Sequence, residues 1–329
     1  MNGFNLKVFS GSCHEKLAEE IAEKIGMKLG ERELLSFANG EKLVRVLENV
    51  RGEDCFVIQP TCNDASIMEL LIFIDALKRA SAQRITAVIP WYGYARQDRK
   101  ASPREPITAK LVARLLETAG VDRVLALDLH SGQIQGFFEI PLDNLTATKF
   151  LEKEIEKKGL KDIVIVAPDA GAAKACTKIS REINAELAII NKSRPKENTC
   201  EAVSIIGEVE GKNCVLFDDM IDTGGSLVAA ACALKKAGAL RVFACATHGL
   251  FSGNAREKLE KSELEEIIVT NSLPQKETSG KIKVLSVAKI LSEAILRIHE
   301  SRSVSELFHN NAQTPLNDFT KKATPELSE

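Results

Sequence analysis

One stretch of the sequence, VLFDDMIDTGGSL at 215–227, combines acidic side chains with a glycine-rich turn. An apolar run ends in Asp218 and Asp219, and a further carboxylate, Asp222, follows them. A Thr-Gly-Gly-Ser segment at 223–226 then opens a pattern typical of a helix. The free N–H groups and dipole of a helix start attract an anion, whereas the carboxylates repel one. The ligand must therefore carry both an anionic end and groups that carboxylates can bind.

A sugar phosphate satisfies both requirements. Asp218 and Asp219 can accept hydrogen bonds from vicinal hydroxyls, and the glycine-rich turn lets backbone N–H groups approach a phosphate closely. The candidate residues of this site are Asp218, Asp219, Asp222, Thr223, Gly224, Gly225 and Ser226. The alternative is an ordinary turn with an N-cap serine and solvated acids. Neither a P-loop pattern nor a dinucleotide-binding glycine pattern occurs in the sequence.

Basic and amide side chains follow a second apolar run. RQDRK at 96–100 comes after AVIPWYGYA, which places Arg96 just past the end of a predicted strand. Arginine can bind a phosphate through two hydrogen bonds, and Gln97 can bond a purine edge or a ribose. The alternative is a solvated basic loop.

Possible metal ligands follow two more apolar runs. LALDLHSGQ places Asp128 and His130 at a strand end, and VIVAPDAGAAKA places Asp169 between a strand and a helix. A lone histidine is usually structural, but a histidine this close to an aspartate is also a candidate to bind or support Mg²⁺. This ion favours one or two protein ligands beside substrate oxygens and water.

Two cations, Lys192 and Arg194, follow the apolar run of AIINKSRP. Pro195 and the polar residues after it predict a mobile loop. Both cations can face a diphosphoryl group from such a loop; the alternative is that the loop is simply solvated.

Alternating apolar runs and amphipathic stretches must position these residues. Strands are predicted at 55–58, 85–89, 124–127, 163–167, 187–190, 214–217, 241–245 and 267–269. Helices are predicted at 66–79, 107–119, 146–157, 171–183, 226–237 and 287–299. This alternation predicts an α/β fold whose mostly parallel sheets are covered on both faces. Ligands of such sheets bind beyond the carboxyl ends of the strands, where the candidate residues lie.

Two segments of the chain recur, which predicts two related domains. VRGEDCFVI (50–58) resembles VEGKNCVLF (209–217), and ALKRASAQRITA (76–87) resembles ALKKAGALRVFA (233–244). We interpret this as an internal duplication, with chance similarity of two strand–helix units as the alternative. The predicted division is a domain over 1–147, a domain over 148–308 whose last helix can return to the first, and a mobile tail over 309–329.

The stretch at 215–227 resembles the phosphoribosyl-pyrophosphate loop of type I phosphoribosyltransferases. Four further segments narrow the family, namely FANGE (37–41), YARQDRK (94–100), DLHSGQIQGFF (128–138) and NKSRP (191–195). Together, over Phe4 to about Phe308, they resemble ribose-phosphate diphosphokinase, also called phosphoribosyl-pyrophosphate synthetase. The resemblance implies two tandem phosphoribosyltransferase-type, Rossmann-like domains. It also implies transfer of the β,γ-diphosphoryl group of ATP to O1 of ribose 5-phosphate, giving phosphoribosyl pyrophosphate and AMP.

The resemblance implies a role for each motif. Lys192 and Arg194 are implied to stabilise the transition state; family members often have a basic residue where this chain has Ser193. His130 is implied to bind the Mg²⁺ on ATP and Asp169 a Mg²⁺ near the ribose hydroxyls, with Asp128 as a further candidate. The residues implied to bind ATP are Phe37, Asn39, Gly40, Glu41, Arg96, Gln97, Asp98 and Arg99. Ribose 5-phosphate is implied to bind the residues of the 215–227 stretch and Arg194.

The resemblance also implies assembly and regulation. The FANGE residues would reach the adenine from a neighbouring subunit, with Phe37 stacked on the base, so a homo-oligomer is expected, and the family suggests a hexamer. Inorganic phosphate as activator and ADP as inhibitor are common in the family. The implied regulatory residues are Arg51, Ser81, Arg104, Asn144, Ser303 and Phe308. A serine frequent in the family just before Val50 and Arg51 is Asn49 here, a departure from the family pattern that concerns phosphate regulation rather than catalysis.

Composition indicates which partners and which cellular compartment to expect for this protein. The formal net charge is −2 and no region is strongly basic, so we expect no nucleic-acid partner. We also expect no membrane partner, because no signal peptide or membrane span is predicted. The eight cysteines contain no C-x-x-C pair, which favours reduced thiols in a cytoplasmic protein.

Two other functions remain as alternatives. A phosphoribosyltransferase that consumes phosphoribosyl pyrophosphate would share the glycine-rich stretch but would not need FANGE, RQDRK or NKSRP. A regulatory homologue without activity would be expected to have lost catalytic residues, whereas Lys192, Arg194 and His130 are all present.

Overall fold

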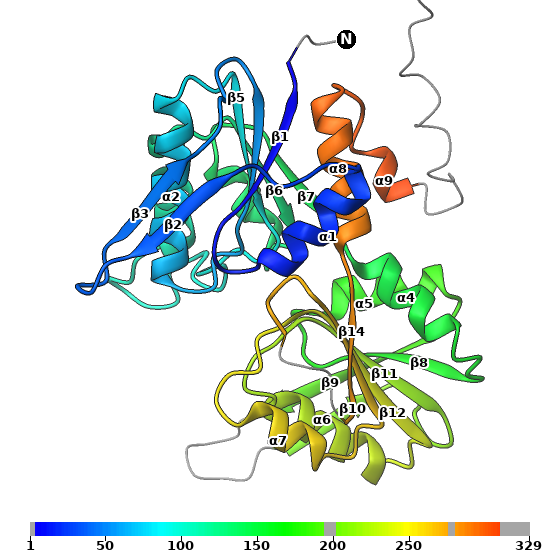
Figure 1. Cartoon of the computed structure of the whole chain (residues 1–329). Coiled ribbons are helices and arrows are strands. Elements are labelled where there is room, and N and C mark those ends of the chain that lie inside the picture. Colours follow the sequence, from blue (N-terminus) through cyan, green and yellow to red (C-terminus); the bar gives the residue numbers. More distant parts are fainter. Residues whose placement is uncertain (1–3, 194–201, 276–279, 310–329) are drawn as a thin grey trace, which may run out of the picture.

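Short runs of buried β-branched and other apolar residues form the strands of two mainly parallel sheets. The computed structural model describes residues 4–193, 202–275 and 280–309. The two sheets define an N-terminal and a C-terminal unit, which lie one above the other in Figure 1. The strand DCFVI of the first sheet is buried at every position, as expected where helices cover both faces.

The N-terminal sheet has five parallel strands in the order β1-β4-β5-β6-β7. Their bounds are β1 Leu6–Ser10, β4 Asp54–Ile58, β5 Arg84–Ile89, β6 Arg123–Leu127 and β7 Leu142–Leu145. On one face Phe9 and Val57 pack with residues of α2 (Asp64–Arg79), α3 (Thr108–Ala119) and the short 3-10 helix η1 (Gly132–Phe137). On the other face Val8 and Phe56 pack with residues of α1 (Glu15–Ile25).

An antiparallel hairpin, which the sequence analysis did not predict, projects from this unit. It consists of β2 (Arg32–Ser36) and β3 (Lys42–Val46), and it extends to the far left of Figure 1 beside α2. Leu34, Val44 and Val46 pack against the N-terminal core, which anchors the base of the hairpin.

The C-terminal sheet has seven strands in the order β10-β9-β8-β11-β12-β13-β14, and only the edge pair β9–β10 is antiparallel. Their bounds are β8 Ile163–Ala167, β9 Glu186–Ser193, β10 Ala202–Ile206, β11 Asn213–Ile221, β12 Arg241–Gly249, β13 Glu266–Thr270 and β14 Ile282–Leu285. The helices α6 (Gly225–Lys236) and α7 (Ala255–Glu260) cover one face, and α4 (Thr148–Glu156) and α5 (Ala173–Glu182) cover the other.

The two units repeat one local arrangement. In the first, β4, α2 and β5 follow one another and the strands pair in parallel. In the second, β11, α6 and β12 do the same. These are the segments whose sequences resemble each other, so the arrangement supports the interpretation of an internal duplication.

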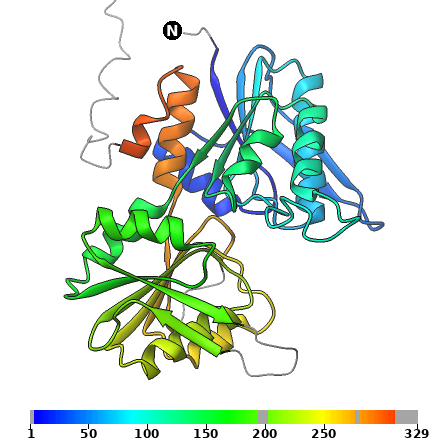
Figure 2. The same cartoon turned by 180° about the vertical axis from the view of Figure 1, so that it is seen from behind.

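After β14 the chain returns to the N-terminal unit. Helix α8 (Ala288–His299) contributes Leu291 and Ile295 to the cluster that holds Val8 and Leu17. Figure 1 and Figure 2, which view the molecule from opposite sides, both show α8 beside α1. The short α9 (Glu306–His309) follows it and includes the first residue of the tail predicted over 309–329; residues 310–329 lie outside the described residues.

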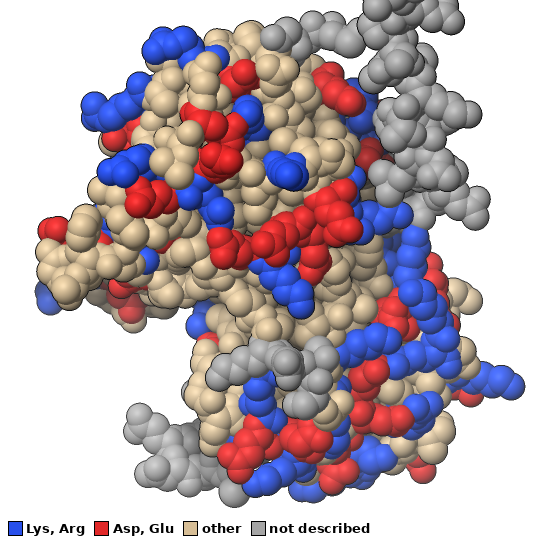
Figure 3. All heavy atoms as spheres, viewed as in Figure 1, with Lys and Arg blue, Asp and Glu red and all other residues tan. Residues whose placement is uncertain are grey.

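The exposed faces carry charges of both signs. Figure 3 shows basic and acidic side chains interspersed, with acidic side chains gathered over α1, which carries Glu15, Glu19, Glu20 and Glu23. Within the described ranges, no helix has the length and apolar character needed to cross a membrane.

Candidate active site

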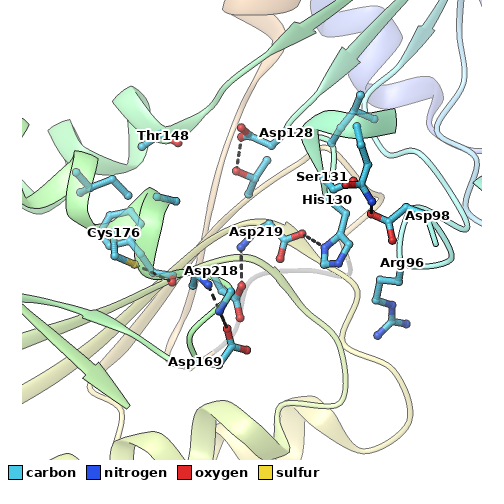
Figure 4. Close-up of a pocket in the computed structure, with 18 of the residues that line it drawn as sticks. Arg96, Asp98, Asp128, His130, Ser131, Thr148, Asp169, Cys176, Asp218 and Asp219 are labelled. Carbon is cyan, nitrogen blue, oxygen red and sulfur yellow. Dashed lines mark hydrogen bonds and ion pairs between the residues drawn. The ribbon is translucent and has the colours of Figure 1, made fainter. Parts of the chain in front are cut away.

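Eight of the candidate residues, drawn from both units, line one cavity of ≈ 580 Å³. The predicted site residues that line it are Arg96, Asp98, Arg99, Asp128, His130, Asp169, Asp218 and Asp219. Figure 4 shows how they converge: Asp128, His130 and Arg96 come from the N-terminal unit, and Asp169, Asp218 and Asp219 from the C-terminal unit. The cavity therefore depends on how the two sheets are placed relative to each other.

The paired acids lie inside a strand, which corrects one sequence-based expectation. Asp218 and Asp219 were expected to end the strand over 214–217, but β11 continues through them to Ile221. The reason is that β12 pairs with this extension, with Asp218 opposite Ala246 and Met220 opposite His248. Only Asp222 consequently separates the end of the strand from the phosphate-loop candidates at 223–226.

Asp219 and His130 are joined across the two units. His130 Nδ1 lies 2.6 Å from Asp219 Oδ2. The hydrogen bond to Asp219 raises the pKa of His130 and outweighs the opposing effect of burial. Burial pushes the pKa of Asp219 upward, but the bond to His130 and its charge leave the Asp219 pKa below its ordinary value. This hydrogen-bonded pair forms one side of the cavity. When Nδ1–H of the neutral ring is donated to Asp219, Nε2 is the His130 atom that remains for a ligand.

The pKa of Asp218 is shifted in the opposite direction to that of Asp219. Burial, followed by the negative charge of Asp219, raises the pKa of Asp218 to about 7. Asp218 Oδ1 accepts a hydrogen bond from the backbone N–H of Asp219 at 2.9 Å. A nearby cation, or hydroxyl groups of a ligand that donate hydrogen bonds, would stabilise the charged form of this carboxyl group.

Asp169 follows β8 and faces the same cavity from an exposed position. Its Oδ1 accepts hydrogen bonds from the backbone N–H groups of Gly171 at 2.8 Å and Ala172 at 3.1 Å. These bonds fix the carboxylate just before α5.

The residues fit a Mg²⁺ that is shared with a substrate rather than held by the protein alone. Among the described residues, no group of three or more His, Cys, Asp or Glu side chains is placed to hold a metal ion. Mg²⁺ commonly uses one or two protein ligands and completes its shell with phosphate oxygens and water. His130 Nε2 and the exposed Asp169 can supply such ligands, whereas Asp128 Oδ2 already accepts hydrogen bonds from Ala147 N and Thr247 Oγ1.

The start of α6 has the features of a phosphate site. Gly224 precedes the helix with φ 73°, a left-handed conformation that glycine adopts without strain. No side chain caps the helix start and no acidic residue lies in its first turn. A side chain at Gly225 would meet only Thr223 Oγ1, 4.0 Å away, so the surrounding space is open. The first N–H groups of α6 are thus left for an anion.

Arg96 spans the opening between the units. Its Nη2 lies 2.8 Å from Asp222 Oδ2, at the approach to the phosphate loop. Arg96 and Gln97 also line a neighbouring cavity of ≈ 280 Å³ that includes Trp91 and Tyr94. Gln97 itself is exposed, and its Oε1 accepts the hydroxyl of Thr108.

The FANGE residues lie away from this cavity. Phe37, Asn39 and Glu41 are exposed at the tip of the β2–β3 hairpin, and Gly40 turns the chain there with φ 89°. None of them lines the cavities described above. A nucleotide in the ≈ 580 Å³ cavity would therefore not meet these residues of its own chain.

The catalytic candidates Lys192 and Arg194 are only partly placed. Lys192 was expected in a loop after the strand at 187–190, but β9 runs to Ser193 and Lys192 pairs with Val203 of β10. The antiparallel edge strand, which the sequence did not reveal, extends β9. Arg194 and Pro195 lie outside the described residues.

The regulatory candidates fall into separate places. Arg51 Nη1 donates to Ser81 Oγ at 3.2 Å, so these two are neighbours. Asn144 Oδ1 accepts from Leu129 N at 3.0 Å, close to His130. Arg104 lies in a turn with φ 69°, and the carbonyl oxygen of Ser303 accepts from Arg297. Phe308 belongs to α9, and its side chain is outside the described part.

Sequence reasoning missed several polar residues of the cavity. They are Ser131, Gln133, Thr148 and Thr247. Gln133 Nε2 donates to Asp98 Oδ2 at 2.7 Å, which holds the candidate Asp98 in place. Thr247 was missed because the apolar run that predicts β12 stops at Cys245, while the strand itself continues to Gly249.

Similarity to known proteins extends over both units of the chain. The N-terminal domain of ribose phosphate pyrophosphokinase matches residues 6–120, and the phosphoribosyl synthetase-associated domain matches residues 167–309. A ribose-phosphate pyrophosphokinase of Fusobacterium nucleatum is 51% identical over 315 residues, which cover 94% of this chain and 100% of that protein. One of Clostridium acetobutylicum is 53% identical, with 93% of this chain and 98% of that protein covered.

The fold agrees with a solved structure of the same kind. The crystal structure of phosphoribosylpyrophosphate synthetase from Mycobacterium smegmatis superimposes with a TM-score of 0.86 at 43% sequence identity. The match covers 90% of this chain and 99% of that one. Since both units and nearly the full length of these relatives are matched, this chain belongs to the ribose-phosphate pyrophosphokinase family.

Proposed function

We propose that this protein is a ribose-phosphate diphosphokinase, which transfers the β,γ-diphosphoryl group of ATP to O1 of ribose 5-phosphate. The products are 5-phosphoribosyl 1-pyrophosphate and AMP, and the role is nucleotide biosynthesis. Family membership supports the reaction. The observation that supports the placement of the site is the ≈ 580 Å³ cavity where His130 and Arg96 of one unit face Asp218 and Asp219 of the other, with Arg96 also paired to Asp222 just before α6.

The sugar phosphate is proposed to bind the C-terminal unit. The uncapped start of α6 takes the 5-phosphate through residues 223–226. Asp218 lies within the same segment and accepts hydrogen bonds from the ribose hydroxyls. Because burial and Asp219 raise the Asp218 pKa to about 7, the carboxylate gains from donors that a ribose supplies.

ATP is proposed to lie across the two units. Arg96 and Gln97 contact the nucleotide, with Arg96 released from Asp222 when a phosphate competes for the guanidinium. His130 Nε2 and Asp169 would hold Mg²⁺, which, when bound, neutralises charge on the phosphates. Lys192 and Arg194 are proposed to stabilise the charge that develops on the transferred group. Positioning and electrostatics dominate catalysis of this type.

We propose that the adenine is held by a second copy of the chain. The hairpin tip with Phe37 is exposed and distant from the cavity of its own chain, which supports a shared site. The expected assembly is a homo-oligomer, with a hexamer suggested by the family. Phosphate activation through the Arg51–Ser81 region is a further part of this proposal, as is a cytoplasmic location.

The decisive experiment measures AMP release from ATP and Mg²⁺, with and without ribose 5-phosphate, and identifies phosphoribosyl pyrophosphate as the second product. AMP formation that depends on ribose 5-phosphate supports the proposal. A phosphoribosyltransferase would instead consume phosphoribosyl pyrophosphate with a base. A regulatory homologue would release no AMP alone. Repeating the assay over phosphate and ADP concentrations tests the regulatory part.

A further inference from the structure

Asp128 occupies a strained turn at the edge of the cavity. Its φ is 40°, in the left-handed region that non-glycine residues rarely adopt. The turn follows β6 and sets the direction in which the chain continues to His130, two residues later. Such a conformation persists only where surrounding contacts hold it.

The Asp128 side chain is bonded from both units. Its Oδ2 accepts hydrogen bonds from Ala147 N at 2.8 Å and from Thr247 Oγ1 at 2.6 Å. Figure 4 shows the Asp128 carboxylate with its bond, set apart from the His130–Asp219 pair. Thr247 belongs to β12 and is 3% exposed, so its hydroxyl has little access to solvent.

His248, which follows Thr247 in β12, forms a hydrogen bond with the Asp128 backbone. His248 Nε2 lies 3.1 Å from Asp128 O, and because a carbonyl oxygen only accepts, Nε2 is the donor. His248 Nδ1 lies 2.8 Å from Ser272 Oγ. The imidazole is 1% exposed, and Trp91 packs against it with ring centroids 4.8 Å apart. The ring is therefore fixed on two sides by hydrogen bonds and on a third by an aromatic contact.

We propose that Thr247 and His248 are positioning residues that hold the Asp128 turn and thereby keep His130 beside Asp219. The inference rests on the proposed diphosphokinase function. We call the hydrogen bonds from Thr247 and His248 to Asp128 the clasp, and the inference assigns Asp128 to the clasp rather than to the metal. Two consecutive residues of β12 bond the side chain and the carbonyl of one strained residue in the other unit. His130 is on the same loop, and Asp128 and Thr247 line the same cavity, so these bonds act at the wall of the cavity on which His130 lies.

The first test compares three threonine variants of the full-length protein. Thr247→Val removes the hydroxyl and keeps the shape, and Thr247→Ser keeps the hydroxyl. Thr270→Val is the matched control, because Thr270 is buried and donates to Thr247 O at 2.7 Å without contacting Asp128. Since hydrogen bonds to charged groups contribute about 1.5–3 kcal/mol, we expect Thr247→Val to lower kcat by about 10- to 100-fold. Thr247→Ser and Thr270→Val should stay within about threefold of the parent.

The second test asks whether Thr247 acts through His130. We expect the KM for ribose 5-phosphate to change little in Thr247→Val, since the phosphate site lies at the start of α6. We also expect the double variant Thr247→Val/His130→Ala to be no worse than His130→Ala alone, because the clasp has nothing left to position. Additive losses, or a selective rise in the KM for ribose 5-phosphate, would overturn the inference.

The third test separates a clasp from a metal ligand. Asp128→Asn retains an oxygen that can accept from Ala147 and Thr247 but loses the negative charge that would attract Mg²⁺. We expect it to keep the Mg²⁺ concentration dependence of the parent, whereas a strongly raised Mg²⁺ requirement would show that Asp128 binds the metal. Thermal unfolding of every variant checks folding. An inactive parent protein would refute the proposed function itself, whereas an active parent with a fully active Thr247→Val would refute only the clasp.

Discussion

Arg96 and Asp222 form an ion pair that joins the two units at the mouth of the cavity, with Nη2 and Oδ2 2.8 Å apart. The arginine side chain is 55% exposed and the aspartate 20%. An exposed pair of this kind contributes little to folding, because solvent screens it. The pair instead lies between the proposed nucleotide and sugar-phosphate sites. A ligand that binds one of the two side chains would break the pair and free the other side chain to bind the second substrate.

Substitution of Arg96 and substitution of Asp222 should therefore each raise the KM of a different substrate. Arg96→Ala is expected to raise the KM for ATP more than that for ribose 5-phosphate, and Asp222→Asn is expected to do the reverse. Each should change the free energy of unfolding by less than about 1 kcal/mol. Steady-state kinetics with denaturant unfolding provides the measurement. Equal effects of both variants on both KM values would contradict the proposed division of the cavity.

Asp218→Asn should weaken the handling of ribose 5-phosphate more than the binding of ATP. Asp218 lies on the β11 segment that leads to the phosphate loop, and its carboxylate is the proposed acceptor for the ribose hydroxyls. The KM of each substrate, measured at saturating concentration of the other, provides the test. A normal KM for ribose 5-phosphate with a greatly raised KM for ATP would contradict the assignment of Asp218 to the ribose 5-phosphate site.

Phe37→Ala should raise the KM for ATP, because a stacked aromatic ring contributes roughly 0.5–1.5 kcal/mol beyond the area it buries. Phe37 is 49% exposed at the hairpin tip, so the substitution should leave the fold of its own chain intact. Mixing this variant with Lys192→Ala should restore part of the activity if the adenine site is shared between chains. Mixed oligomers without any rescue would indicate that each site is built from one chain.

Lys192→Ala should lower kcat far more than substrate affinity. Removal of one preorganised donor that stabilises a developing charge costs roughly 10²–10³ in kcat. Calorimetric Kd values for ATP and ribose 5-phosphate should change only slightly. Arg194→Ala should behave similarly, and the double variant should be less than additive if both cations act on one group. A variant that keeps kcat but loses ATP affinity would make Lys192 a binding residue.

Glu152 gives a prediction for stability against pH. Burial raises its pKa from 4.5 to about 7, although Lys149 Nζ lies 3.0 Å from Oε2 and opposes the shift. The folded state therefore holds this proton more tightly than the unfolded state, and stability decreases as pH rises from 4.5 through 7. Glu152→Gln should gain stability relative to the parent above pH 7, on the order of 1–3 kcal/mol.

The matched control for this prediction is Glu156→Gln, an exposed position on the same helix. Denaturant unfolding at about pH 4 and about pH 8 gives the comparison, since these values bracket the two pKa values of Glu152. An equal change in stability at both pH values for Glu152→Gln would show that the carboxyl group titrates normally in the folded protein.

The sequence determined the elements whose signals are local. The apolar runs at 55–58 and 85–89 became β4 and β5, and the amphipathic stretch at 287–299 became α8, because periodicity depends only on neighbouring residues. The glycine-hydroxyl turn at 223–226 likewise indicated the uncapped start of α6. Each of these features would be recognisable in a fragment of the chain.

Tertiary structure decided the features that depend on distant partners. β11 extends through Asp218 because β12 pairs with it, and β9 extends through Lys192 because β10 does. The hairpin β2–β3 forms on a surface that α2 provides, and α8 returns to α1 after a full second unit. No local pattern carries this information, because strand ends and packing faces are fixed by the neighbour that supplies the hydrogen bonds and the apolar contact.

The same division applies to the site. The sequence determined which residues can bind phosphate, hydroxyls and Mg²⁺, since those abilities belong to the side chains themselves. Only the fold brought His130 to Asp219 and Thr247 to Asp128, pairs that lie in different units and far apart along the chain. The pKa shifts of His130 and Asp219 and the bonding of Asp128 follow from those contacts, because burial and charge act over a few ångströms of space and not along the sequence.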